Sequence, residues 1–114
     1  MALLIPTHLW ALPAVETVSG GPTSGYLDGN TEQVALFNHP IGLAFGTGTN
    51  SLAGDVLYVA DRDNNAIRKL DLELGQTVTF LTSKISQPVG VVLDSGGNLH
   101  VLNRGNGNNG TVLE

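Results

Sequence analysis

The clearest pattern in the chain is a pair of short apolar stretches separated by a polar tight turn, over residues 57–70 (LYVADRDNNAIRKL). Apolar and polar positions alternate on both sides of the turn, which is typical of β-strands and not of helices. A weaker copy of the same hairpin follows over residues 99–113 (LHVLNRGNGNNGTVL). Two copies of one hairpin in a chain of 114 residues predict an all-β repeat protein.

The region around the first copy predicts a meander of four antiparallel strands. The strands are expected at residues 42–45, 55–60, 66–72 and 77–81, separated by turns in which Gly, Asn and Asp are frequent. These residue types tolerate the positive φ angles that tight turns need. The order then begins again, because Gln87–Gly90 repeats His39–Gly42 and Leu99–Val101 repeats Leu57–Val59. A four-stranded unit that recurs after about 40 to 50 residues is typical of β-propeller blades.

These two repeats divide the chain into three parts. Residues 39–82 form the predicted complete blade, and residues 83–114 form a second blade that is truncated after its third strand. Residues 1–38 are expected to hold an N-terminal arm, a spare outer strand at Ala14–Ser19 and a Gly-rich linker. The spare strand precedes the linker, as the outermost strand of a preceding blade would.

The spare strand and the truncated blade together predict a homo-oligomer. Ala14–Ser19 of one copy would complete the truncated blade of another by strand exchange, which would give two four-stranded antiparallel blades per chain. Three such chains would close a six-bladed propeller; six blades are common in the family that the chain resembles (below), and this resemblance implies a trimer as the favoured assembly. The alternative is that the chain is a fragment of a longer propeller.

Residue types at fixed positions in the first copy resemble those of the NHL-repeat family of β-propellers. The resemblance rests on Pro40-x-Gly42, Leu57–Asp61 and Ile67–Leu70, preceded by Gly25–Gly29 in the linker. The Asn-His-Leu triplet that names the family is absent, and Asn64–Ala66 stands in its place. The resemblance implies a non-catalytic binding or scaffolding module that recognises a protein or small ligand at its top face. The alternative that it implies is an enzyme of the six-bladed propeller type, a metal-dependent lactonase or a lyase.

Composition removes several classes of partner. The net charge is −5, and the five Lys and Arg side chains form no basic cluster that would neutralise a run of phosphates, so nucleic acid is not an expected partner. The apolar run Ala2–Val15 contains two prolines and is shorter than the roughly 20 residues of a membrane span, so no membrane partner is expected either. The absence of cysteine excludes disulfides and thiol chemistry and leaves the cellular compartment open.

Candidate ligand contacts come from the loops that propeller geometry places at the mouth of the central channel. These loops enter the inner strands or join second strands to third strands. Their candidate residues are His39, Asp61, Arg62, Asp63, Lys84, Asn103 and Arg104. Arg62 and Arg104 occupy equivalent positions in the two copies, so a ring would repeat them around the mouth.

One turn carries a spacing of acidic residues that resembles the start of a calcium loop. Asp61-x-Asp63-x-Asn65 matches its first half, but Ala66 stands where an EF-hand needs glycine and Leu72 where it needs a chelating glutamate. The EF-hand is therefore rejected, and a looser structural or catalytic calcium site remains the open alternative. The sequence predicts no cofactor, no metal site and no catalytic residues.

Overall fold

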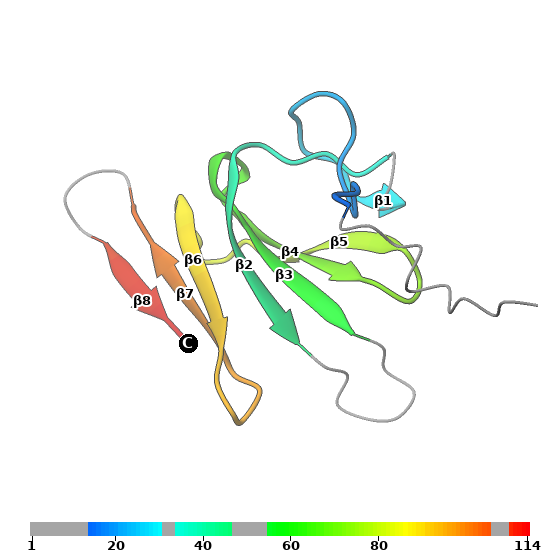
Figure 1. Ribbon diagram of the computed structural model, residues 1–114. Coiled ribbons are helices and arrows are strands. Elements are labelled where there is room, and N and C mark those ends of the chain that lie inside the picture. Colours follow the sequence, from blue (N-terminus) through cyan, green and yellow to red (C-terminus); the bar gives the residue numbers. More distant parts are fainter. Residues whose placement is uncertain (1–13, 31–33, 47–54, 106–109) are drawn as a thin grey trace, which may run out of the picture.

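The computed structural model describes residues 14–30, 34–46, 55–105 and 110–114 (Figure 1). These residues form two antiparallel sheets, which confirms the all-β prediction. The strands are β1 (Gly29–Asn30), β2 (Pro40–Gly46), β3 (Val56–Asp61), β4 (Ala66–Asp71), β5 (Gln76–Leu81), β6 (Pro88–Leu93), β7 (Leu99–Asn103) and β8 (Thr111–Leu113). A 3₁₀ turn, η1 (Arg62–Asn64), joins β3 to β4. No helix in the described part of the chain is long and apolar enough to cross a membrane.

The first sheet contains the predicted four-stranded meander and one further edge strand. Its order is β1-β5-β4-β3-β2. The sequence predicts a loop where the short strand β1 lies; in the structure Gly29 pairs with Thr77 of β5, at the outer edge of the meander. The linker thus covers part of an edge that would otherwise be open to pairing with another chain.

The second sheet has the order β6-β7-β8, and it packs face to face against the first sheet with β6 beside β2 (Figure 1). The core lies between the two sheets. The first sheet contributes Ala44, Ala60 and Ile67 to it, and the second repeat contributes Ile85, Val91 and Val101. The two repeats therefore fold as two stacked blades, with the second blade formed by three strands in the described residues.

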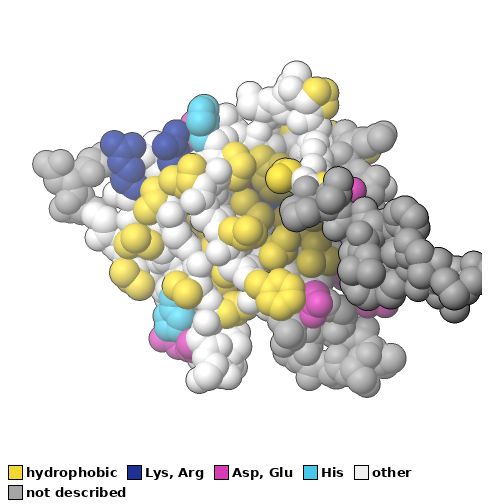
Figure 2. All heavy atoms as spheres, in the orientation of Figure 1, with side chains coloured by type: hydrophobic (Ala, Val, Ile, Leu, Met, Phe, Trp, Pro, Cys, Tyr) yellow, Lys and Arg dark blue, Asp and Glu magenta, His cyan; other side chains and the backbone are white. Residues whose placement is uncertain are grey.

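Each sheet also has an apolar face that points away from the other sheet. On the first sheet Leu43 lies opposite Val59 and Phe45 opposite Leu57, and Leu43 and Phe45 are more than half exposed. On the second sheet Leu102 lies opposite Val112, and both are exposed. Because strand side chains alternate between faces, a strand that is apolar at every position belongs in a sheet that is covered on both sides. Figure 2 shows apolar side chains over the middle of the visible surface.

The predicted outer strand at Ala14–Ser19 is not present in this chain. Its backbone is irregular, with a bend at Val18 and Ser19. The Ser19 hydroxyl lies 3.1 Å from the Thr77 hydroxyl of β5, so the segment approaches the first sheet through a side chain. β1 already occupies the outer edge of β5 at Gln76 and Thr77. The predicted N-terminal arm lies outside the described residues as far as Pro13.

Candidate functional site

The loops at one edge of the two sheets carry most of the predicted site residues. We define the rim as the exposed or half-exposed side chains at this edge: His39, Arg62, Asp63, Lys84, Gln87 and Arg104. Figure 2 shows basic side chains and a histidine gathered along the upper edge of the molecule. The rim thus combines loops of both repeats.

The first repeat contributes an ion-pair cluster to the rim. His39 Nδ1 lies 2.6 Å from Asp63 Oδ2, and Arg62 Nε donates a 2.8 Å hydrogen bond to Asp63 Oδ1. The hydrogen bond from Arg62 is the main cause that holds the pKa of Asp63 below its usual value. The positive charge of Arg62 is therefore already opposed by a carboxylate.

The second repeat presents its cations differently. Gln87 takes the place of His39, and the Arg104 main-chain N–H donates to the Gln87 carbonyl oxygen at 2.9 Å. The Arg104 guanidinium makes only a long contact of 3.4 Å with the Gln87 side-chain oxygen. The ion pairs found among the described residues include neither Lys84 nor Arg104. This half of the rim therefore presents two cations without a neighbouring carboxylate.

The two halves of the rim are held together through one asparagine. The side-chain oxygen of Asn65, at the end of η1, accepts a 2.9 Å hydrogen bond from the Gln87 main-chain N–H. The sequence analysis missed both residues, although the position of Gln87 equivalent to His39 was a signal for it. Asn65 carried no separate signal, because Asn is common in any tight turn.

Backbone strain is concentrated at the same edge. Four non-glycine residues in the described segments have positive φ angles: His39 at 53°, Asn65 at 50°, Lys84 at 62° and Gln87 at 44°. Three of these four are rim residues, and Asn65 joins the two halves of the rim. A conformation of this kind costs of order 1–3 kcal/mol per residue and is often found at functional sites. The strained backbone fixes the direction in which the rim side chains point.

Two predicted site residues are buried beneath the rim. Asp61 is fully buried, and its carboxylate accepts hydrogen bonds from the Asn38 main-chain N–H and the Asn64 side chain, both at 2.8 Å. Asn103 occupies the equivalent position in the second repeat and is also buried. Its side chain accepts from the Ser86 main-chain N–H at 3.1 Å and donates to the Lys84 carbonyl oxygen at 2.8 Å. Both residues position the rim loops.

The calcium-like spacing does not bring its carboxylates together. The Asp61 carboxylate faces the buried hydrogen-bond donors under the rim, whereas Asp63 is at the surface with Arg62 and His39. Across the described ranges, no three His, Cys, Asp or Glu side chains are grouped closely enough to hold a metal ion.

The opposite edge of the second sheet has a tight turn organised by Asp94. One carboxylate oxygen accepts the main-chain N–H groups of Gly96 and Asn98 at 2.9 Å, and the other lies 2.9 Å from His100 Nε2. The hydrogen bond with His100 is the largest cause, followed by those from Asn98, of a strongly lowered pKa for Asp94.

We expect this turn to stabilise the fold only while Asp94 is ionised. Because the folded-state pKa is lowered, the stabilisation is complete above the ordinary pKa of about 3.9 and is lost as the pH falls through the folded-state value. Asp94→Asn should therefore reduce stability at pH 7, and the difference from wild type should shrink as the pH falls below 4. Urea unfolding between pH 7 and pH 2 measures this. The control Glu73→Gln neutralises an exposed carboxylate in the β4–β5 turn; an equal effect of both variants would contradict the role of Asp94.

Comparison with known proteins gives a clear but partial match. No protein-family model matches the chain. The chain is 47% identical over 55 residues to NHL repeat-containing protein 2 of Gallus gallus, and 34% identical over 71 residues to the Homo sapiens protein of the same name. These alignments cover 48% and 62% of this chain but only 6% and 9% of the relatives. The resemblance to NHL-repeat proteins is confirmed. The chain spans less than a tenth of the length of these relatives.

A solved structure supports the blade architecture. The chain matches an auxiliary nutrient binding protein from Bacteroides thetaiotaomicron with a TM-score of 0.60 and 21% sequence identity. The match covers 74% of this chain and 25% of that protein. At this level of identity the match shows a shared fold alone.

The NHL-like residues of the first blade have structural roles in this fold. Asp61, which ends the Leu57–Asp61 motif, binds donors under the rim, and Arg68 of the Ile67–Leu70 motif is fully buried. Gly42 lies at a close approach of the two sheets, because a Cβ placed on it would be 3.1 Å from Gly90 Cα. The NHL-like motif therefore accounts for the fold and leaves the rim side chains available for a ligand.

Proposed function

We propose that this protein is a non-catalytic binding module of the β-propeller type, whose rim recognises an acidic group of a protein or small-molecule ligand. One observation carries the proposal: Lys84 and Arg104 are exposed and form no ion pair with a carboxylate of the described residues. Arg62, the equivalent of Arg104, is paired with Asp63. An arginine guanidinium presents several N–H donors in a plane that fits a carboxylate, and such charge-assisted hydrogen bonds are strong.

The surroundings of the two cations support a binding role. The loops that carry them are held by the buried side chain of Asn103 and by strained backbone at Lys84 and Gln87, so little order is left to gain when a ligand binds. Loops positioned by a rigid scaffold are common places for recognition. One protein of similar fold is itself described as nutrient binding, and proteins of related fold also bind many other ligands.

The proposal predicts binding of acidic probes that depends on Arg104. Citrate, succinate and a short peptide rich in Asp and Glu are titrated into the ¹⁵N-labelled chain, and shifts of the amide resonances of residues 84–87 and 104 are followed. Arg104→Gln should weaken binding at least about tenfold, since one charge-assisted hydrogen bond contributes about 1.5–3 kcal/mol. Lys69→Gln is the matched control, because Lys69 lies on β4 away from the rim.

Two results would contradict the acidic-ligand proposal. One is the absence of shifts at the rim with every probe. The other is a loss of affinity in Lys69→Gln as large as that in Arg104→Gln, which would indicate general attraction between a cation and an anion in place of a site.

A further inference from the structure

We propose that copies of this chain associate head to tail through their two free sheet faces. The leading face is the side of the first sheet that points away from the second sheet. Leu43 and Phe45 are exposed on it, Leu57 and Val59 are half-buried, and Leu70 is buried. The trailing face is the exposed side of the second sheet and consists of Val92, His100, Leu102 and Val112. The trailing face of one copy would pack on the leading face of the next. This association is independent of any ligand at the rim.

The trailing face is the counterpart, in the second repeat, of a first-repeat surface that is buried between the two sheets. Each of its four residues is the repeat equivalent of a first-sheet residue that faces the second sheet, and these equivalents are Ala44, Tyr58, Ala60 and Ile67. In the first repeat these positions are buried or partly buried against the second sheet. In the second repeat Val92 is 63% exposed and Val112 is 71% exposed. The trailing face therefore has the apolar character of a packed surface, and no sheet of the described residues covers it.

The leading face matches the opposite half of the same packing. A groove of about 430 Å³ opens on it between residues 16–19 of the N-terminal segment and the sheet, and its sheet-side lining includes Phe37, Leu43, Leu57 and Val59. Their equivalents in the second repeat are Ile85, Val91, Leu99 and Val101, which are the residues that the second repeat packs against the first sheet. The described residues thus carry both halves of one sheet-to-sheet interface. Each half is packed against a sheet once and has no sheet against it in its other occurrence.

Gly90, in the middle of β6, gives a separate indication that the backbone of another sheet packs closely on the trailing face. A Cβ on Gly42 would lie 3.1 Å from Gly90 Cα and 3.3 Å from the Val89 carbonyl oxygen, so the first sheet needs glycine there for the second sheet to approach. A Cβ on Gly90 would meet nothing nearer than Leu102 Cβ at 3.6 Å, and Gly90 has no positive φ angle. Glycine inside a strand is unfavourable without such a reason. Glycine at position 90 is explained if the backbone of another copy's leading face packs closely against it.

A second copy is the occupant that fits these observations. Its leading face offers the Ile41–Leu43 backbone to Gly90, as Val89–Val91 approaches Gly42 within the chain. Because the two faces differ, the contact is heterologous and can propagate until a ring closes. Three copies would bring six sheets together, within the range of about four to eight blades known for propellers. This mode of association does not need strand exchange by Ala14–Ser19.

Light scattering coupled to size-exclusion chromatography tests the proposal on the full chain. We expect wild type to elute with a mass above that of a single chain of 11.9 kDa. Gly90→Val, which adds a side chain that the isolated chain has room for, should convert it to a monomer with an unchanged circular dichroism spectrum. Val92→Glu tests the same face independently, and Leu43→Glu tests the leading face; both positions are more than 60% exposed, so neither should prevent folding.

Mixing the variants distinguishes head-to-tail pairing from other arrangements. Gly90→Val retains an intact leading face and Leu43→Glu retains an intact trailing face, so an equimolar mixture should form a heterodimer and nothing larger. A monomeric wild type at 100 µM, which is about 1 mg/ml, would overturn the proposal and would favour coverage by further blades of a longer chain. An oligomer that persists in Gly90→Val, or variants that remain monomeric when mixed, would overturn it as well.

Discussion

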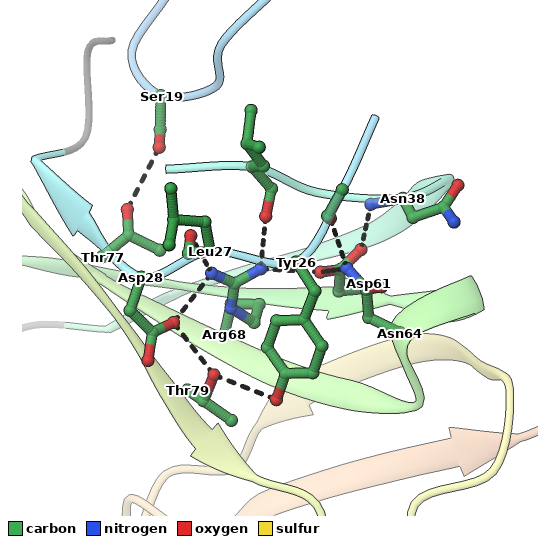
Figure 3. Close-up of polar contacts among 12 residues, drawn as sticks. Ser19, Tyr26, Leu27, Asp28, Asn38, Asp61, Asn64, Arg68, Thr77 and Thr79 are labelled. Atoms are coloured by element: carbon green, nitrogen blue, oxygen red, sulfur yellow. Dashed lines mark hydrogen bonds and ion pairs between the residues drawn. The ribbon is translucent and has the colours of Figure 1, made fainter. Parts of the chain in front are cut away.

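Arg68→Met should lower the free energy of unfolding by about 3–5 kcal/mol, the loss typical when one partner of a buried ion pair is removed. The Arg68 side chain is fully buried on β4, and one terminal nitrogen donates 2.8 Å and 2.7 Å hydrogen bonds to the Asp61 carboxylate and the Leu36 carbonyl oxygen (Figure 3). Methionine would leave the buried Asp61 carboxylate without its cation. A loss of this size is a large part of the 5–15 kcal/mol that stabilises a typical domain.

The same guanidinium also attaches the linker to the blade. Its other terminal nitrogen donates to the Leu27 carbonyl oxygen at 2.7 Å and to Asp28 Oδ1 at 2.8 Å (Figure 3). Its carbon lies 5.1 Å from the ring centroid of Tyr26 and 4.8 Å from that of Phe37, within the range of cation–π attraction. Burial alone would raise the pKa of Asp28, but hydrogen bonds from Thr79 and Arg68 outweigh it and the pKa is lowered. We therefore expect Arg68→Met to release residues 25–30 and 34–38 before the sheets separate.

Urea unfolding followed by far-ultraviolet circular dichroism measures the loss, and amide hydrogen exchange of residues 25–30 and 34–38 measures the release of the linker. Lys69→Met is the matched control, since it removes the adjacent cation, which lies on the other face of β4, 5.9 Å from the Phe80 ring centroid. It should change stability by less than about 1 kcal/mol. Asp61→Asn combined with Arg68→Met should cost less than the sum of the single changes, because neither charge is then left alone. Equal effects of Arg68→Met and Lys69→Met would contradict this account.

The strand pattern was predictable because it depends on local alternation and turn residues. The hairpin from Val56 to Asp71 is found close to its predicted bounds, since β-branched and apolar positions specify the strands and the polar residues at 61–65 specify the turn. Short-range alternation could not separate Ala14–Ser19 from a true strand, because strand formation there depends on a free sheet edge. β1 was missed for the related reason that a two-residue strand has too few positions to show a period.

The candidate site was predictable in its loops but not in which side chains reach solvent. The repeat alignment places Arg62 and Arg104 at the same edge, where the structure also places them. Alignment could not show that Asp61 and Asn103 point inward, because the buried donors that they satisfy come from residues distant in the sequence. Arg68 was missed as a structural residue for the same reason: a charged residue in a strand usually indicates a solvated face, and its partners lie in the linker.

Gly42→Val should cost about 2–3 kcal/mol, the second-largest effect expected, because it overfills a close backbone contact between the two sheets. The first added carbon would lie 3.1 Å from Ala60 Cβ and 3.3 Å from the Val89 carbonyl oxygen. The Val89 oxygen belongs to the backbone of β6, which cannot move aside as a flexible side chain can. The sheets must therefore separate locally, and the buried contacts of Val91 and Ala44 weaken with them.

Gly90→Val is the matched control, since the two glycines are repeat equivalents and, among the described sheets, only Gly42 has another sheet packed against it. Its first added carbon would lie 3.6 Å from Leu102 Cβ, an ordinary contact. Both changes are compared in the Leu43→Glu background, in which the proposed association is blocked, so that urea unfolding reports on one chain. We expect Gly42→Val to lose at least about 2 kcal/mol and Gly90→Val to lose less than about 1 kcal/mol. Equal losses would mean that both glycines are required by the strand itself, and the stacking of sheets would then explain neither of them.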